Sequence, residues 1–190
     1  MTSRLEKTGE YIVVDGIDGG GKGALFESLN KEFATLVDGK PSFYFTREPG
    51  GTELGQKIRE LLLHKYMSPE SELDLFHAQR RELRASVLRD ILVSGAHVIS
   101  DRSDSSTFAY QVRGRNRPEL ENQFWLKRDT LLPLPTFYVF LDLDPEIAAG
   151  RIAGRNEDSG DRFDRENVQF FTRVRQGFID FAKKVTRLVR

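Results

Sequence analysis

A glycine-rich segment that directly follows a short apolar run constrains this chain more than any other feature. The run is Tyr11 to Val14, and residues Gly16 to Gly23 then read G-I-D-G-G-G-K-G. Glycines let a backbone wrap closely enough for its N–H groups to point at a phosphate, and Lys22 supplies a cation beside them. A helix predicted from Lys22 to Leu36 adds its positive N-terminal end. The segment therefore predicts a strand, a phosphate-binding loop and a helix, and with them nucleotide binding.

The predicted loop lacks one usual component. The Ser or Thr that commonly follows the lysine and binds Mg²⁺ is replaced by Gly23, and Ala24 comes next, so this stretch offers no hydroxyl. We still expect the loop to hold the phosphates of a nucleotide through its backbone and its lysine. The residues of this predicted donor site are Gly16, Gly19, Gly20, Gly21, Lys22, Gly23 and Ala24.

Composition excludes several other classes of protein. Lys plus Arg and Asp plus Glu number 29 each, which argues against a protein that coats nucleic acid by neutralising phosphates. The chain has no cysteine, so it forms neither disulfides nor thiolate metal sites. No apolar stretch approaches the roughly 20 residues of a membrane span, and residues 1–9 are polar rather than signal-like. We expect a single domain over residues 1–190, in a protein of the cytoplasm.

Short β-rich runs alternate with amphipathic stretches, which is typical of a parallel sheet with helical crossovers and so of an α/β fold. The four predicted strands are Tyr11 to Val14, Ser42 to Thr46, His97 to Ser100 and Thr136 to Leu141. One helix is predicted to bury Leu54, Ile58, Leu61 and Leu62 on one face. A last helix carries an apolar stripe from Val168 to Leu188, which we interpret as packing within the fold, with a seam for a partner helix as the alternative.

Two further segments place charges where predicted strands end, the edge at which open α/β sheets bind ligands. T-R-E-P-G-G-T at Thr46 to Thr52 offers Arg47 to a phosphate or carboxylate, unless Arg47 only stabilises the turn. In D-R-S-D-S-S-T-F-A-Y-Q at Asp101 to Gln111, Asp101 is a candidate for holding magnesium through water and Arg102 for bridging two phosphates. A structural ion pair is the alternative for this second segment.

A helical motif and a polar loop complete the candidate site. Phe76 and Arg80 lie four residues apart, so a ring and a guanidinium on one helix face can meet the same planar base, although Phe76 alone is more often a core residue. Arg151, Arg155 and Arg162 flank a glycine-containing polar loop, which is suited to a lid over a nucleotide or to a solvated surface. The predicted lid covers about residues 151–165.

At this point the sequence resembles the thymidylate kinase family of P-loop nucleoside monophosphate kinases over nearly its whole length. The resemblance rests on D-G-I-D-G-G-G-K, T-R-E-P-G-G-T, F-H-A-Q-R, D-R-S-D-S-S-T-F-A-Y-Q and D-R-F, in that order along the chain. It implies a three-layer P-loop NTPase fold, with a central parallel sheet flanked by helices and a short lid loop. It also implies phosphoryl transfer from ATP to a deoxypyrimidine monophosphate such as dTMP, with Mg²⁺ as cofactor, and a homodimer.

The resemblance also assigns roles to residues. By carry-over, Asp18 contacts the acceptor's sugar and phosphate region, Lys22 the donor phosphates, and Arg47 and Arg102 the acceptor phosphate. On the same basis Phe76 stacks on the base, Arg80 bonds its carbonyl edge, Thr107 reads a further polar position, and Tyr110 crowds the ribose 2′ carbon. Because Gly19 and Gly20 leave no arginine in the loop, the chain is similar to the family's lid variant, with Arg155 as the catalytic charge stabiliser, backed by Arg151 and Arg162.

Two alternatives remain open at the level of sequence. The first is a kinase for dUMP or a 5-substituted dUMP, since a missing methyl group is worth only about 1 to 3 kcal/mol in an apolar pocket. Ser103, which stands where the family often has an aromatic residue or histidine, leaves room for a bulkier base. The second is a catalytically silent nucleotide-binding protein, which the missing loop hydroxyls favour and the retained lysine and arginines oppose.

Overall fold

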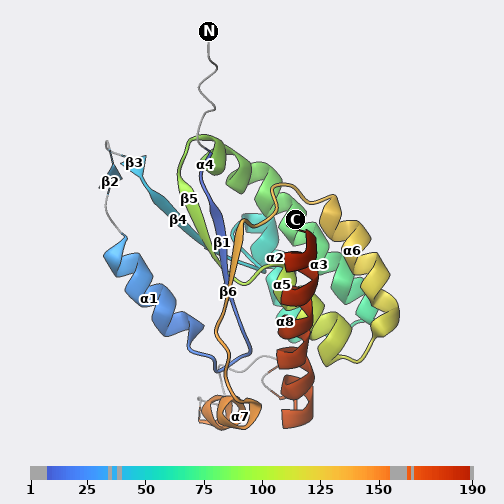
Figure 1. Cartoon of the computed structure of the whole chain (residues 1–190). Coiled ribbons are helices and arrows are strands. Elements are labelled where there is room, and N and C mark those ends of the chain that lie inside the picture. The colour runs from blue at the N-terminus through green and yellow to red at the C-terminus, as the bar shows by residue number, and fades with distance from the viewer. Residues whose placement is uncertain (1–7, 34–35, 38–39, 155–161, 164, 189–190) are drawn as a thin grey trace.

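The four predicted strands form one parallel sheet. The computed structural model describes residues 8–33, 36–37, 40–154, 162–163 and 165–188 (Figure 1). The strands are β1 (Tyr11–Asp15), β4 (Phe43–Arg47), β5 (His97–Asp101) and β6 (Phe137–Phe140), in the order β4-β5-β1-β6. In this register Arg47 lies beside Asp101, and Asp101 lies beside Val14. The ends of neighbouring strands therefore bring the predicted site segments to one edge.

Helices follow the strands as the alternating pattern predicts. They are α1 (Lys22–Glu32), α2 (Glu53–His64), α3 (Pro69–Leu83), α4 (Arg89–Val93), α5 (Asp104–Thr107), α6 (Glu121–Asp129), α7 (Pro145–Ala153) and α8 (Val168–Leu188). Residues Arg84–Leu88 and Phe108–Gly114 form π-helical segments, Pro118–Leu120 a 3₁₀ turn, and β2 (Leu36–Val37) and β3 (Lys40–Pro41) a small hairpin. Helix α1 thus ends before the predicted Leu36, because the chain there enters the hairpin.

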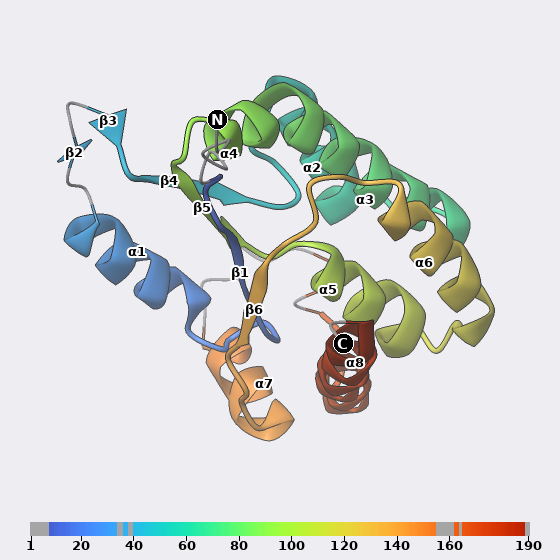
Figure 2. The same ribbon diagram turned by 45° about the horizontal axis from the view of Figure 1, so that its top comes forward.

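Helices cover the two faces of the sheet unequally. Helix α1 lies on one face, whereas α3, α5, α6 and α8 lie on the other, and α7 lies near the edge where the strands end (Figures 1 and 2). On the more populated face Tyr11 and Val13 pack against Leu83 and Leu88. Side chains alternate between the two faces along a strand, so every second residue of β1 points into this core. The structure thus confirms the α/β fold with helices on both sides of a parallel sheet.

The stripe of helix α8 packs within the chain, as interpreted from the sequence. Phe171, Val174, Phe178 and Phe181 are buried. A Cβ atom at Gly177 would come within 2.7 Å of the Ala109 Cα atom, so the absence of a side chain there lets α8 approach the π-helical segment closely. This contact packs the π-helical segment that carries Tyr110 against α8.

The predicted buried face of α2 is only half right. Ile58 and Leu62 are buried, but Leu54 and Leu61 are 49% and 45% exposed. Ile58 and Leu62 lie one turn apart and face the core, whereas Leu54 and Leu61, seven residues apart, lie at the flank of the apolar face and remain in solvent.

His77 on α3 makes the stability of the fold sensitive to acid. The side chain is buried, and neither ring nitrogen has a hydrogen-bond partner among the described residues. Burial, followed by the charge of Arg80, lowers the pKa of His77 to about 3. Below the ordinary pKa of about 6.5, His77 is protonated in the unfolded chain but stays neutral in the folded chain. Folding therefore becomes less favourable as pH falls.

We therefore expect the free energy of unfolding to fall by about 2 kcal/mol for His77 alone between about pH 7 and pH 5. Urea unfolding at the two pH values measures this change. His77→Leu should flatten the dependence, whereas substitution of the exposed His64 by leucine should not. A wild-type protein and a His77→Leu variant with the same pH slope would contradict the expectation.

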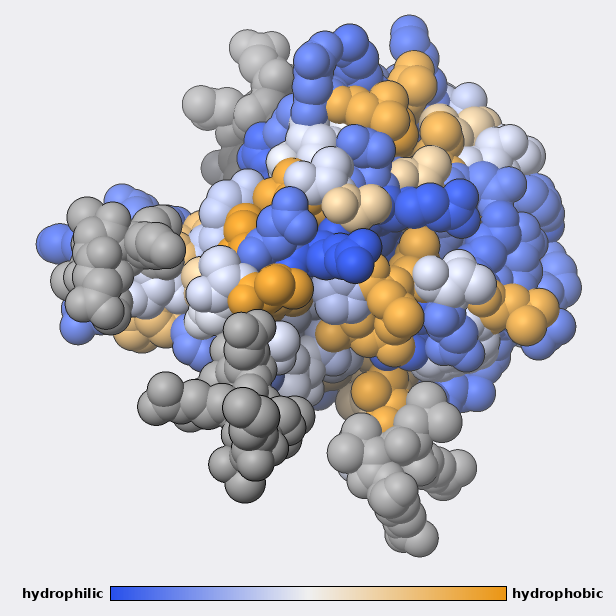
Figure 3. All heavy atoms as spheres, turned by 90° about the horizontal axis from the view of Figure 1, so that it is seen from above, coloured by the Kyte–Doolittle hydropathy of each residue, from blue (hydrophilic) through white to orange (hydrophobic). Residues whose placement is uncertain are grey.

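The face at which the strands begin lies opposite the predicted site. It shows hydrophobic residues interleaved with hydrophilic ones (Figure 3). No helix in the described part of the chain is long and apolar enough to cross a membrane. The predicted site segments lie at the opposite edge, where the strands end.

Candidate active site

The glycine-rich loop joins β1 to α1 at the carboxyl edge of the sheet. A Cβ atom at Gly16 would lie 2.5 Å from the Leu141 carbonyl oxygen, so only glycine fits where the loop leaves β1. Gly21 has a φ of 88° and precedes the first residue of α1, and the space beside it is open. Gly23 and Ala24 are exposed in the first turn of α1. The loop thus presents backbone N–H groups and a helix N-terminus to open space, as an anion site requires.

Lys22 lies inside this loop and is largely buried. Its Nζ atom donates to the carbonyl oxygens of Gly16 and Ile17, each at 2.9 Å. Burial, and then the nearby charge of Arg102, lower the pKa of Lys22 to about 8, whereas Asp18 acts in the opposite direction. The lysine thus carries its charge at neutral pH and lies within the loop that is predicted to receive phosphates.

Arg102 reaches across the carboxyl edge from the end of β5 to the loop. It adopts a φ of 68°, unusual for a residue other than glycine, and such strained backbone concentrates at functional sites. Its guanidinium pairs with the Asp18 carboxylate and donates to the Gly16 carbonyl oxygen at 3.2 Å and to Ser106 Oγ at 2.8 Å. Tyr110 donates its hydroxyl to Asp18 Oδ2 at 2.8 Å. The structure therefore brings together four of the predicted residues, Asp18, Lys22, Arg102 and Tyr110.

A pocket opens beside this cluster. Arg102, Asp18 and Tyr110 line it together with Phe76 and Arg80 of α3. Its further lining residues are Glu48, Pro49, Arg59, Leu63, Ser103, Ser106, Gln111 and Phe163. The pocket thus has charged groups beside the loop and an aromatic ring and a guanidinium from α3, which suits an anionic ligand with a planar ring.

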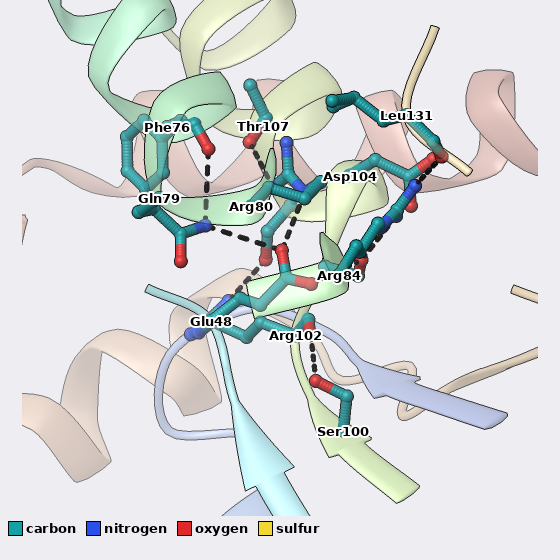
Figure 4. Close-up of polar contacts among 12 residues, drawn as sticks. Glu48, Phe76, Gln79, Arg80, Arg84, Ser100, Arg102, Asp104, Thr107 and Leu131 are labelled. Atoms are coloured by element: carbon teal, nitrogen blue, oxygen red, sulfur yellow. Dashed lines mark hydrogen bonds and ion pairs between the residues drawn. The ribbon is translucent and has the colours of Figure 1, made fainter. Parts of the chain in front are cut away.

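The Arg80 guanidinium bonds protein groups through two of its nitrogens, and its third nitrogen has no partner among the described residues. The side chain is 1% exposed. Its Nε atom donates to Glu48 Oε2 at 2.5 Å and its Nη2 atom to Thr107 Oγ1 at 3.0 Å (Figure 4). The Nη1 atom is buried without a hydrogen-bond partner among the described residues. A single unpartnered donor suits a carbonyl oxygen, whereas a carboxylate or phosphate suits the two-pronged fork.

Gln111, which the sequence analysis did not select, lines the same pocket and carries a second polar atom without a partner among the described residues. Its Nε2 atom donates to Glu72 Oε1 at 2.7 Å. Its Oε1 atom is buried and without a hydrogen-bond partner in the described part of the chain. The residue closes the A-Y-Q motif, yet nothing in the sequence indicates which way its amide faces.

Two predicted acceptor-binding residues do not line this pocket. Arg47 shares a sheet face with Phe45, whose ring meets Phe26 of α1, so the alternation of β4 places Arg47 on the α1 side. It lines a separate hollow there with Asp101. Thr107 is fully buried behind Arg80, and its hydroxyl bonds that guanidinium. Arg59 of α2, which the sequence analysis did not select, lines the pocket instead and donates to the Pro49 carbonyl oxygen at 3.0 Å.

The predicted lid arginines separate in the structure. Arg151 of α7 donates to the Gly19 carbonyl oxygen at 3.0 Å, so it lies beside the glycine-rich loop. Arg162 is buried, donates to the Leu62 carbonyl oxygen at 2.6 Å and pairs with Glu72 at 2.8 Å. Its charge thus holds the chain against α2 and α3 here, and its predicted contact with the donor nucleotide stays a prediction. Arg155 lies outside the described residues, as does most of the predicted lid.

Asp101 fits the predicted role in magnesium binding. It ends β5, and its charge acts on the pKa values of Lys22 and Arg102, so it lies close to both. Its Oδ1 atom is buried without a hydrogen-bond partner among the described residues. Carboxylate oxygen is the ligand type that Mg²⁺ prefers. No group of three or more His, Cys, Asp or Glu able to hold a metal occurs in the described ranges, so further ligands would have to include water and nucleotide phosphates.

Comparison with known proteins agrees with this geometry. The sequence model of the thymidylate kinase family matches residues 14–189. A thymidylate kinase of Methylobacillus flagellatus is 39% identical over 92% of this chain and 84% of its own, and one of Ralstonia pickettii is 41% identical over 90% and 83%. The crystal structure of thymidylate kinase from Ehrlichia chaffeensis superposes with a TM-score of 0.69 at 30% identity, covering 93% of this chain and 86% of that one.

Proposed function

The chain belongs to the thymidylate kinase family, and we propose that it transfers the γ-phosphoryl group of ATP to dTMP, giving ADP and dTDP for deoxynucleotide biosynthesis. The γ-phosphorus–oxygen bond to ADP breaks, and a phosphate oxygen of dTMP forms the new bond. Such a transfer depends on positioning two anionic nucleotides and on stabilising charge at the transferred group. Acting in deoxynucleotide metabolism, the protein would work in the cytoplasm.

One observation carries the proposal: two residues that line the pocket beside Arg102 each carry a buried polar atom without a hydrogen-bond partner among the described residues, one a donor and one an acceptor. The donor is Arg80 Nη1 and the acceptor is Gln111 Oε1. The adjacent O4 and N3–H of a thymine ring are an acceptor and a donor, so they are complementary to this pair. Phe76 offers its ring to the face of the base. The phosphate of such a ligand would extend toward Arg102 and Asp18.

The donor site would lie on the other side of Lys22. The loop from Gly16 to Ala24 and the start of α1 would bind the phosphates of ATP, with Arg151 beside them. We infer that Arg155 approaches the transferred group when both nucleotides are bound. Asp101, with water and phosphate oxygens, would hold Mg²⁺, which neutralises charge on the phosphates when bound.

The organisation of the protein remains part of the proposal. We infer one kinase domain and a homodimer. The exposed leucines of α2, Leu54 and Leu61, offer an apolar surface to a second copy. Sedimentation would test for the dimer. Substitution of both leucines by serine should weaken the association of the two copies.

Base selectivity tests the proposed acceptor pocket. With saturating ATP and Mg²⁺, we expect kcat/KM for dTMP to exceed that for dCMP by about 10³-fold or more, because cytosine would place a donor against Arg80 and an acceptor against Gln111. The ratio of dTMP to dUMP should be smaller, about 10- to 200-fold, since only a methyl group differs. A coupled assay over the three nucleotides measures both ratios.

Gln111→Leu is the matched variant for this assay. It removes the acceptor while it keeps a side chain of similar size, so the preference for dTMP over dCMP should shrink. A wild-type enzyme that phosphorylates dCMP as well as dTMP would contradict the proposed reading of the base.

A further inference from the structure

A glutamine amide can read a base only if something fixes which end faces it. The oxygen accepts and the nitrogen donates, and the two ends have nearly the same shape. A half turn of the Gln111 amide would exchange the acceptor in the pocket for a donor. Such a pocket would then suit the N3 atom of cytosine rather than the N3–H of thymine.

Glu72 of α3 is the residue that fixes this amide. It is 1% exposed, and its Oε1 atom lies 2.7 Å from Gln111 Nε2. An ionised carboxylate only accepts hydrogen bonds, so it holds the nitrogen end of the amide and turns the oxygen end toward the pocket. The Gln111 side chain is itself only 1% exposed, so little water competes with Glu72 for the nitrogen end of the amide.

Two arginines keep Glu72 in this role. Arg115 Nε lies 3.4 Å from Glu72 Oε1, and Arg162 Nη2 lies 2.8 Å from Glu72 Oε2. Both guanidinium groups bring donors to the carboxylate, so its oxygens are surrounded by donors only. Arg162 also belongs to the predicted lid, and the neighbouring Phe163 lines the pocket. Glu72 thus contacts the residue that would read the base and the segment that closes one side of its pocket.

We propose that Glu72 is the positioning residue that sets the base preference of the enzyme, by orienting the amide of Gln111 so that the pocket accepts thymine or uracil and rejects cytosine. The proposal rests on the proposed function, since it takes the pocket as the site of a nucleotide base. Glu72 does not line the pocket itself, so its effect is exerted through Gln111.

Glu72→Gln tests this directly. The introduced amide has one oxygen, for which Arg115 and Arg162 both compete as donors, and its nitrogen is then free to donate to Gln111. We expect the Gln111 amide to turn, and the kcat/KM ratio of dTMP to dCMP to fall at least about 10-fold. Isothermal titration with each nucleotide should show the same relative change in affinity.

Three variants separate orientation from a merely structural role. Glu72→Asp still only accepts and should keep the preference for dTMP better than Glu72→Gln does. Arg162→Gln breaks one ion pair but leaves Glu72 bonded to Gln111 and paired with Arg115, so it should keep most of the wild-type ratio. The double variant Glu72→Met with Arg162→Met removes both charges of the pair together, which is often tolerated in a core, and should lower the ratio if Glu72→Gln does not fold.

Two results would overturn the inference. One is a folded Glu72→Gln protein, or a folded double variant, that keeps the wild-type dTMP to dCMP ratio. The other is an Arg162→Gln protein that loses the ratio as fully as Glu72→Gln does. Failure of the wild-type protein to phosphorylate dTMP would count against the proposed function instead, and the two titrations would still test Glu72 through the relative affinity for dTMP and dCMP.

Discussion

Replacing Arg102 by alanine should lower kcat with dTMP by about 10³-fold or more, the effect of losing a guanidinium that stabilises a transferred phosphoryl group. Arg102 pairs with Asp18 and contacts the Gly16 carbonyl oxygen, so it lies between the loop and the pocket. It would therefore touch both nucleotides, and kcat/KM for each should fall. Steady-state kinetics at saturating ATP, with varied dTMP, measure this loss.

The fold must be checked separately, because Arg102 also lies 3.4 Å from the buried carboxylate of Asp15. Burial raises the pKa of Asp15 and the charge of Arg102 opposes that shift, so the alanine variant should be less stable as well as slower. Arg113→Ala is the matched control, since Arg113 pairs with Glu121 and Asp180 outside the pocket. An Arg102→Ala enzyme with kcat within about 10-fold of Arg113→Ala would remove Arg102 from the chemistry.

Lys22→Met should lower kcat by a similar factor, about 10³-fold, but with a different signature. The lysine lies inside the loop, bonded to the carbonyl oxygens of Gly16 and Ile17, and it does not line the pocket proposed for dTMP. The variant should therefore bind dTMP with nearly wild-type affinity while it loses turnover. Titration of dTMP, beside kcat at saturating dTMP, separates the two effects.

Lys31→Met provides the comparison, since Lys31 is exposed in the last turn of the same helix. It should change neither kcat nor the affinity for dTMP. If Lys22→Met weakened dTMP binding as strongly as it lowered kcat, Lys22 would belong to the acceptor site, and the proposed separation of the two nucleotides would be wrong.

Local chemistry explains why the sheet and the loop could be predicted from the sequence. The strands are short runs of β-branched and aromatic residues, and all four occur within a residue or two of their predicted bounds. The loop was identified from glycines whose backbone conformation few other residues adopt, as at Gly21, and from the lysine that follows. Asp18, Phe76, Arg80, Arg102 and Tyr110 meet in one pocket because strand ends and one helix face bring them together.

The parts that could not be predicted depend on which way a side chain faces. Arg47 is the last residue of β4, near the edge where Arg102 lies, yet the alternation of β4 turns it to the α1 side. The sequence around Arg162 predicts an exposed charge in a loop, but the side chain is buried and pairs with Glu72 of α3, which is distant in sequence. The role of Gln111 depends on the orientation of its amide, which is set by the same partner, Glu72. No local pattern encodes these long-range pairings.

The central claim is that the loop with Lys22 and the pocket with Arg102 hold two nucleotides end to end for phosphoryl transfer. The most direct test is a phosphotransfer assay with ATP and Mg²⁺ over dTMP, dUMP, dCMP and dAMP, with each nucleotide also titrated against the protein. We predict ADP and dTDP in equal amounts, with dTMP the preferred acceptor. Tight binding of dTMP and ATP without any transfer would contradict the claim.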